Sequence, residues 1–252
     1  MDAFVADSIL VAAVVPSPNC EARTMPLDML VLHYTGMADA AAALAKLTSA
    51  EGKVSTHYVV LEDGRIVQCV PEALRAWHAG ASEWEGMGDV NSRSIGIEIA
   101  NPGHGLGYPA FPEVQVAAVI ALCRDILARH PIRPVRVVAH SDIAPGRKKD
   151  PGEKFPWAEL AAAGVGHWVA PVAPGEPVGL SLGDIGAAVL GLQRAFAAYG
   201  YPVPQNGVFD EPTRHVVIAF QRHFRPDRVD GIADESTRAT LRKLLAAVPI
   251  EA

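Results

Sequence analysis

Cysteine is scarce in this chain of 252 residues, and its three copies form no recognisable pattern. Cys20, Cys69 and Cys123 are odd in number, and none belongs to a CxxC pair. The sequence therefore gives no support for a disulfide framework or for a cysteine-rich structural zinc site. Buried thiols in a reducing compartment are the simplest interpretation.

Long apolar runs and basic runs are also missing. The apolar stretch Ile9–Val15 is far shorter than the ~20 residues of a membrane-spanning helix, so we expect no integral membrane segment. Asp2 and Asp7 stand where a signal peptide would carry positive charge, so no export signal is evident. The net charge is −6 and the basic cluster Arg147–Lys149 is short, which argues against nucleic acid as a partner.

What the chain does contain is apolar residues, which make up 50% of it, while aromatic residues make up only 6%. Such a chain predicts one large domain and one small domain, with alanine-rich helices packed on a sheet. Residues 169–181 contain three prolines and two glycines without an apolar period, which is typical of a linker. We therefore expect domains at 1–168 and 182–250, joined by this linker.

Strand and helix patterns alternate in the first domain, which predicts an α/β fold with a central mixed β-sheet flanked by helices. Residues 29–34 form a continuous apolar run, as in a strand covered on both faces. In the run 94–100 the isoleucines occupy alternate positions, so they should face one way and Glu98 the other. The other predicted elements are a hairpin with strands at 54–61 and 65–70, a strand at 135–139, and helices at 38–47 and 112–130.

A short repeat marks the second domain. Asn206–Arg214 echoes Asp230–Arg238, and each copy reads as a tight turn, an aspartate N-cap and the start of a helix. A further helix is predicted at 185–199. Two copies are too few for a solenoid, so the sequence predicts a small three-helix bundle.

Two of the nine histidines stand out. His33 and His140 each end an apolar strand, and functional groups gather where the strands of such sheets end. The polar loop 141–152 can carry Asp150 back toward His140. Two histidines and a carboxylate with a fourth position open are the ligands of a catalytic zinc, but spacing alone equally allows hydrogen-bonded structural histidines. Four other histidines need no catalytic role. His130 is expected at a helix end, where it can interact with the helix dipole, and the positions expected in the linker or on helix surfaces are those of His167, His215 and His223.

Several short motifs occur together: the loop 140–152, Tyr34-Thr35-Gly36, Ser55-Thr56-His57-Tyr58, Ala76-Trp77-His78-Ala79-Gly80 and Ser94-Ile95-Gly96-Ile97-Glu98. In this order they resemble the AmpD-like zinc N-acetylmuramoyl-L-alanine amidases, over about residues 25–160. Residues 180–248 resemble the peptidoglycan-binding module attached to such enzymes, through the repeated turns and Phe220-Gln221. The resemblance implies an amidase/peptidoglycan-recognition-like catalytic domain followed by a wall-binding one.

The resemblance also implies the reaction, which is hydrolysis of the amide between N-acetylmuramic acid and L-alanine in bacterial peptidoglycan or anhydro-muropeptides. By this resemblance, the ligands of one Zn²⁺ per chain are matched by His33, His140 and Asp150, and the catalytic residues are matched by Glu98 and Lys148. Zinc lowers the pKa of bound water to about 7. Glu98 would take the proton of that water and pass it to the leaving nitrogen, while Lys148 would stabilise the oxyanion. Small neighbours of Glu98, Gly96 and Ala100, would leave room for substrate.

Substrate-binding roles are assigned to four residues of these motifs, Tyr34, His57, Trp77 and His78. Trp77 could offer an apolar wall to a sugar face and His78 a hydrogen bond. The alternative is that Trp77 belongs to the core and that His78 supports a ligand. His57 alternates with Tyr58 along a strand, so one of the two should face the cleft. Arg147 could pair with a carboxylate or hold its loop.

Two other classes of function compete with the enzyme. A non-catalytic peptidoglycan recognition protein on the same fold is expected to lack a ligand, and all three are present here. A metal-free hydrolase would need an activated Cys or Ser beside a histidine, and Ser141 is more simply part of its loop. The compartment is open, because the lack of an export signal favours the cytoplasm whereas a wall-binding module favours the periplasm or cell envelope. It is also open whether the substrate is intact wall or a soluble fragment. The oligomeric state and the role of His104 are open as well.

Overall fold

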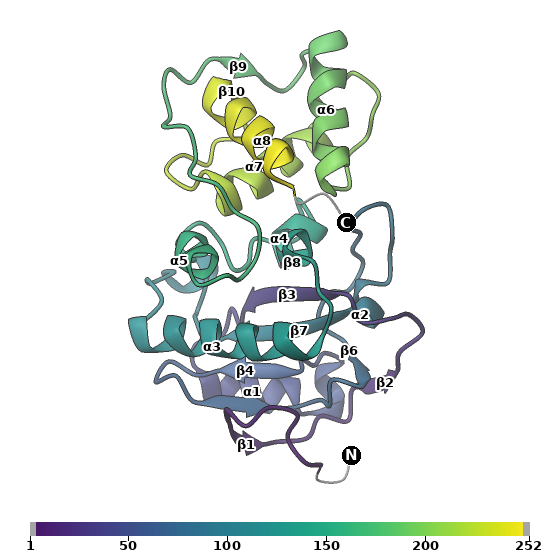
Figure 1. Ribbon diagram of the computed structural model, residues 1–252, viewed down its shortest axis with the longest axis vertical. Coiled ribbons are helices and arrows are strands. Elements are labelled where there is room, and N and C mark those ends of the chain that lie inside the picture. Colours follow the sequence, from purple (N-terminus) through teal and green to yellow (C-terminus); the bar gives the residue numbers. More distant parts are fainter. Residues whose placement is uncertain (1–3, 249–252) are drawn as a thin grey trace.

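The computed structural model describes residues 4–248 and consists of a sheet-containing part followed by a helical part (Figure 1). The strands are β1 (Val11–Val14), β2 (Cys20–Ala22), β3 (Met29–Tyr34), β4 (Tyr58–Val60), β5 (Ile66–Gln68), β6 (Leu74–Ala76), β7 (Ser94–Ile99), β8 (Val137–Ala139), β9 (Gly179–Leu180) and β10 (Ala233–Asp234). The α-helices are α1 (Ala40–Leu47), α2 (Val90–Arg93), α3 (Glu113–Arg129), α4 (His140–Ile143), α5 (Trp157–Ala162), α6 (Ala187–Tyr199), α7 (Glu211–Phe224) and α8 (Glu235–Ala247). Short 3-10 turns are η1 (Ala50–Gly52), η2 (His104–Leu106) and η3 (Pro134–Arg136).

A six-stranded sheet in the order β1-β5-β4-β7-β3-β8 forms the centre of the first part. It is mixed, because β4 and β5 pair antiparallel while the other neighbouring strands run parallel. The predicted α/β class with a mixed central sheet is therefore confirmed, as is the hairpin, which is the β4–β5 pair. The strand expected from Val135 begins only at Val137, because residues 134–136 form the 3-10 turn η3 instead.

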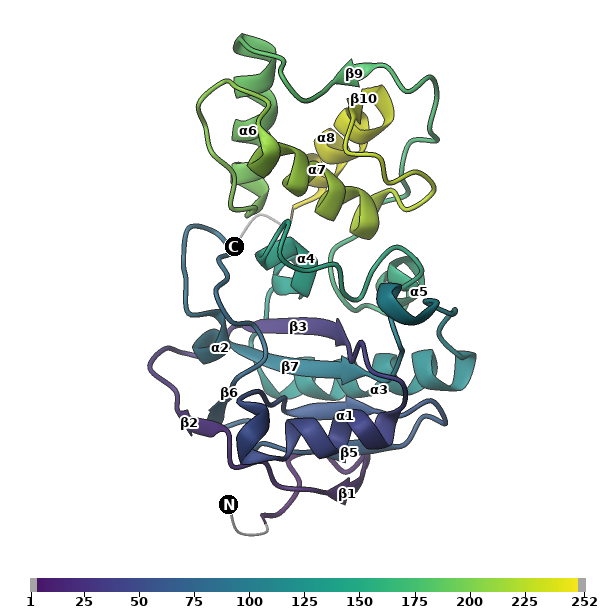
Figure 2. The ribbon, with the colours of Figure 1, turned by 180° about the vertical axis from the view of Figure 1, so that it is seen from behind.

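The helices α3 and α1 cover opposite faces of the sheet, as Figures 1 and 2 show. The α3 face holds the apolar side chains of β3 and β7, among them Leu30, Ile95, Ile97 and Ile99. On the α1 face, Ala43 and Leu47 pack against β4 and β5. The predicted alternation along β7 is confirmed, and it leaves Glu98 on the face opposite α3.

Three helices make up the C-terminal module, which we define as residues 182–248, and this confirms the predicted bundle. Asp210 and Asp234 cap α7 and α8 by accepting from the amides of Thr213 and Thr237. The sequence repeat also has a common interior. Each turn folds around a buried glutamine of the preceding helix, Gln193 or Gln221, whose side chain bonds the turn backbone and the threonine. Of the helices in the described part of the chain, none has the length and apolar character needed to cross a bilayer.

The module packs tightly on the sheet-containing part. The buried ring of Trp84 lies edge-on to Tyr199 and Tyr201, at centroid distances of 6.1 and 5.1 Å. The backbone joins here as well, since the amide of Glu85 donates to the carbonyl of Gly200 over 2.9 Å. One apolar core thus runs through both parts.

This packing predicts the effect of a small substitution at Gly200. A Cβ there would lie 2.6 Å from the Trp84 ring, whereas a Cβ at Gly186, at the other end of α6 and with a similar φ, would meet nothing within 4 Å. We expect Gly200→Ala to lower the free energy of unfolding by about 1–3 kcal/mol more than the control Gly186→Ala, because only the first overpacks the interface. Urea unfolding of both variants measures this, and equal losses would contradict it.

Candidate active site

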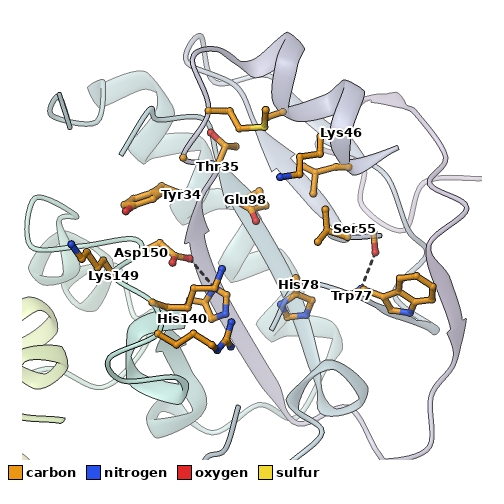
Figure 3. Close-up of a pocket in the computed structure, with 17 residues that line it drawn as sticks. Tyr34, Thr35, Lys46, Ser55, Trp77, His78, Glu98, His140, Lys149 and Asp150 are labelled. Carbon is orange, nitrogen blue, oxygen red and sulfur yellow. Dashed lines mark hydrogen bonds and ion pairs between the residues drawn. The ribbon is translucent and has the colours of Figure 1, made fainter. Parts of the chain in front are cut away.

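A cleft of about 390 Å³ opens beside the carboxyl ends of β3 and β8 (Figure 3). The end of β3, the β7 residue Glu98, the first residue of α4, the loop after it and the helix α1 all contribute to its wall. The lining residues are Tyr34, Thr35, Gly36, Met37, Ala43, Lys46, Leu47, Val54, Ser55, Trp77, His78, Glu98, His140, Arg147, Lys148, Lys149 and Asp150.

Three buried side chains from distant parts of the sequence converge at the cleft. Nδ1 of His33 lies 2.8 Å from Nδ1 of His140 and 3.0 Å from Oδ2 of Asp150, and the His140 nitrogen lies 2.9 Å from the same oxygen. Their exposed fractions are 1%, 2% and 6%. Among residues 4–248 this is the one group of three or more histidine, cysteine and carboxylate side chains close enough to share a metal ion.

Hydrogen bonds at the far side of each imidazole set its orientation. Nε2–H of His140 donates to the carbonyl of Ala79 over 3.0 Å. Nε2–H of His33 donates to Nδ1 of His78 over 3.0 Å, and His78 in turn donates from Nε2 to the Ser94 hydroxyl over 3.1 Å. This network assigns the proton of both ligand imidazoles to Nε2, so each presents an Nδ1 lone pair to the shared point.

The charge states suit a cation. Burial and the neighbouring His140 lower the pKa of His33 to about 4, so its imidazole is neutral at neutral pH. Burial opposes ionisation of Asp150, but positive charge and a donated hydrogen bond from a histidine outweigh it and hold the pKa of that carboxyl far below its ordinary range; with both Nδ1 atoms unprotonated, a metal ion would have to supply that positive charge. Two lone pairs and a carboxylate oxygen at 2.8–3.0 Å repel one another unless a cation lies among them. The donor set therefore fits a bound divalent metal.

Glu98 lies beside the candidate metal ligand His33 because of strand register. The parallel pairing of β3 and β7 sets it opposite His33, on the same face of the sheet. Its Oε2 is buried with no hydrogen-bond partner among the described residues. Burial and the charge of Asp150 raise the pKa of Glu98 well above its ordinary value, although Lys148 and Lys46 oppose this. Such a carboxyl takes up a proton more readily than an exposed glutamate does, which suits a proton carrier.

Cationic side chains line the rest of the cleft. Lys148 and its exposed neighbour Lys149 come from the ligand loop, and Lys46 comes from α1, where no sequence motif had marked it. The guanidinium of Arg147 donates to the carbonyls of Ala79 and Ala81 over 2.6 and 2.7 Å. Of the two roles left open for Arg147, the structure thus shows that it holds its loop.

Two sequence expectations near Glu98 need correction. The space left by Gly96 is not free for substrate, because a Cβ there would lie 2.5 Å from the His78 ring, which occupies it. His57 does not reach the cleft either. It is fully buried, its Nδ1 accepts from the amide of Gly96, and its Nε2 lies 2.9 Å from the guanidinium of Arg23. Tyr58, the alternative, is buried against Glu72. Alternation of side chains could not reveal this, because the strand that starts directly after His57 is covered on both faces, by α3 and by α1.

The remaining substrate-binding candidates border the cleft. Tyr34 and Trp77 are both half-buried in its wall, and the buried His78 also lines it. His104 lies next to them, 3.0 Å from the Tyr34 hydroxyl. The helix-surface position predicted for His223 is wrong, because its side chain is buried and only 3% exposed. Its spacing from the core residues Val216 and Phe220 was the available signal.

Comparisons with known proteins agree with this site. Residues 23–153 match the N-acetylmuramoyl-L-alanine amidase family and residues 185–241 match a putative peptidoglycan binding domain. The chain belongs to this amidase family, and the reaction is hydrolysis of the amide between N-acetylmuramic acid and L-alanine. N-acetylmuramoyl-L-alanine amidase AmiD of Escherichia coli is 41% identical over 240 residues, which cover 87% of this chain and 82% of AmiD.

Further relatives differ in how much of the chain they match. The 1,6-anhydro-N-acetylmuramyl-L-alanine amidase AmpD of Escherichia coli is 38% identical, and the match covers 88% of AmpD but 58% of this chain. The structure of Escherichia coli AmiD with anhydro-N-acetylmuramic acid-L-Ala-D-gamma-Glu-L-Lys superposes with a TM-score of 0.74 at 39% identity, covering 90% of this chain and 92% of AmiD. AmpDh3 of Pseudomonas aeruginosa gives 0.74 at 36% identity, covering 89% and 93%.

The contact between His78 and His33 can be tested directly. We expect His78→Phe, which keeps a ring in the space beside Gly96 but removes the acceptor for Nε2–H of His33, to weaken divalent-metal affinity by about 10–100-fold. Competition with a chromophoric chelator measures this. Thermal unfolding of the metal-free protein serves as the control, and an unchanged affinity in the folded variant would show that His78 does not orient the ligand.

Proposed function

We propose that the cleft binds one Zn²⁺ through Nδ1 of His33, Nδ1 of His140 and Oδ2 of Asp150, and that this ion serves the amidase reaction. The observation that carries the proposal is the meeting of two imidazole lone pairs and an ionised carboxylate within 3.0 Å. Three protein ligands leave one of zinc's usual four positions for water or substrate. When bound, zinc lowers the pKa of water to about 7 and polarises a carbonyl oxygen.

Glu98 is the proposed proton carrier. Its carboxylate takes the proton of the attacking water and gives it to the leaving alanine nitrogen, which cannot depart as an anion. Two observations support the role, its unpartnered buried Oε2 and its raised pKa. Lys148, in the same cleft, is proposed to stabilise the negative charge that develops on the carbonyl oxygen. Tyr34, Trp77 and His78 are retained as candidates for contact with substrate.

The competing classes of function have less support. A recognition protein without catalysis would have no use for Glu98 held unpartnered beside three intact ligands. A thiol nucleophile is disfavoured because burial raises the pKa of both Cys69 and Cys123 to about 12, and no cysteine lines the cleft.

We propose the following division of labour, with catalysis in residues 1–168, a linker at 169–181, and wall attachment by the helical domain 182–250. The linker is not free, since the amide of Val172 donates to Thr240 of α8 over 3.0 Å. Attachment raises the local concentration of polymeric substrate without changing the active site. The structures of AmiD and AmpDh3 in complex with anhydro-muramic peptides support muropeptides as the substrate class.

Product analysis tests the proposal. Purified sacculi and a soluble anhydro-muropeptide are treated side by side with native, chelator-treated and zinc-restored protein. We expect mass spectrometry to find free stem peptide beginning with L-alanine from at least one substrate, to lose it after chelation and to recover it with zinc. Full activity after complete removal of zinc would overturn the metal mechanism.

A substitution separates the proton carrier from the ligands. We expect Glu98→Gln to lower turnover by about 10²–10⁴-fold because a neutral amide cannot accept a proton. The variant should still hold one zinc per chain by elemental analysis, like the native protein. Loss of zinc from Glu98→Gln would mean that this residue is a ligand and that its role has been misassigned.

A further inference from the structure

Helix α7 of the C-terminal module lies against the segment that supplies two of the three ligands, residues 140–153. Figure 2 shows α7 next to α4, the short helix that begins with His140. At the start of the segment, Nδ1 of His223 lies 2.6 Å from Oδ2 of Asp142. At its end, the guanidinium of Arg222 lies 3.5 Å from the carboxylate of Glu153. Two adjacent residues of α7 thus contact both ends of the ligand segment.

The Asp142 carboxylate is the centre of the first contact. It is fully buried and receives three hydrogen bonds. Two come from the module, from the Tyr201 hydroxyl over 2.7 Å and from His223. The third comes from the backbone amide of Ala139, the residue before the ligand His140, over 2.8 Å. The same carboxylate therefore joins the module to the backbone that orients a ligand.

The aromatic rings around this contact restrict the movement of the His223 side chain. His223 is stacked between Trp157 and Phe224, at centroid distances of 3.7 and 3.8 Å. In the middle of the ligand segment, α7 makes a further close approach, since a Cβ on Gly146 would lie 2.4 Å from the His215 ring. Buried, fully paired carboxylates are rigid and costly to disrupt, because a lost donor leaves charge unpaired.

A module that served only as a tether would need no such contacts. AmpD of Escherichia coli is matched over 88% of its length by 58% of this chain, so amidases of this family exist without a counterpart of the remainder. In this chain, by contrast, two of the three donors to Asp142, Tyr201 and His223, lie outside residues 23–153, which match the amidase family.

We propose that the C-terminal module positions the metal-ligand segment, with Tyr201 and His223 acting through Asp142 on His140. They are positioning residues, since neither lines the cleft. The proposal rests on the proposed zinc site and goes beyond wall attachment, because it makes the module part of the support for catalysis on any substrate, including soluble ones.

A matched pair of substitutions in the full chain tests this. Tyr201 and Tyr199 are both buried and both flank Trp84, but the Tyr199 hydroxyl bonds His167 and not the ligand segment. We expect Tyr201→Phe to weaken zinc affinity, measured by chelator competition, by about three- to tenfold, less than the ~10–100-fold effect of a direct partner of a ligand. Its kcat on a soluble anhydro-muropeptide should fall similarly with KM unchanged, while Tyr199→Phe stays within about twofold of native.

A second pair separates positioning from stability. His223→Phe keeps the stacked ring but loses the donor, whereas His223→Asn loses the ring but can place an amide N–H near the position of Nδ1–H. We expect zinc affinity to be higher in His223→Asn, even if its melting temperature is the lower of the two. Equal zinc affinities in Tyr201→Phe and Tyr199→Phe, or the reverse order at position 223, would overturn the inference. If native protein failed to bind zinc, the proposed function itself would fail.

Discussion

The site depends on where the outer nitrogens of two histidines donate their protons. His33 donates to His78 and His140 donates to the Ala79 carbonyl, so both inner lone pairs remain available and meet Asp150. Two imidazole lone pairs and a carboxylate held this close inside a protein repel one another unless a cation lies among them. The glycine at position 96, which makes room for His78, and Arg147, which shares the Ala79 carbonyl, serve the same arrangement.

The sheet supplies the rest of the geometry. Parallel register between β3 and β7 sets Glu98 beside His33, and β8 leads directly into α4, whose first residue is His140. The strands thus bring Glu98, the proposed proton carrier, and the proposed ligands His33 and His140 to one edge, while the loop after α4 returns with Lys148 and Asp150. The C-terminal module contacts the outer side of α4 through Asp142. One domain is thus proposed to serve both wall attachment and active-site support.

Much of this could be predicted from local sequence. Apolar runs and alternation located β3, β7 and the hairpin, and the polar loop after His140 indicated how Asp150 returns. What could not be predicted depends on contacts between distant residues. The small residue Gly96 predicts space for substrate, but the His78 ring fills that space. The alternation of His57 with Tyr58 predicts that one of them faces the cleft, but both are fully buried. The partnership of His223 with Asp142 joins residues 81 positions apart, which no local pattern encodes.

X-ray absorption at the zinc edge of the fully loaded native protein tests the central claim most directly. The account predicts a nitrogen- and oxygen-only coordination shell at about 2.0–2.2 Å, with outer-shell scattering from two imidazoles, and loss of one of the two imidazoles in His140→Ala. A shell that contains sulfur, or one whose imidazole count does not change in that variant, would contradict the convergence of His33, His140 and Asp150 on one ion.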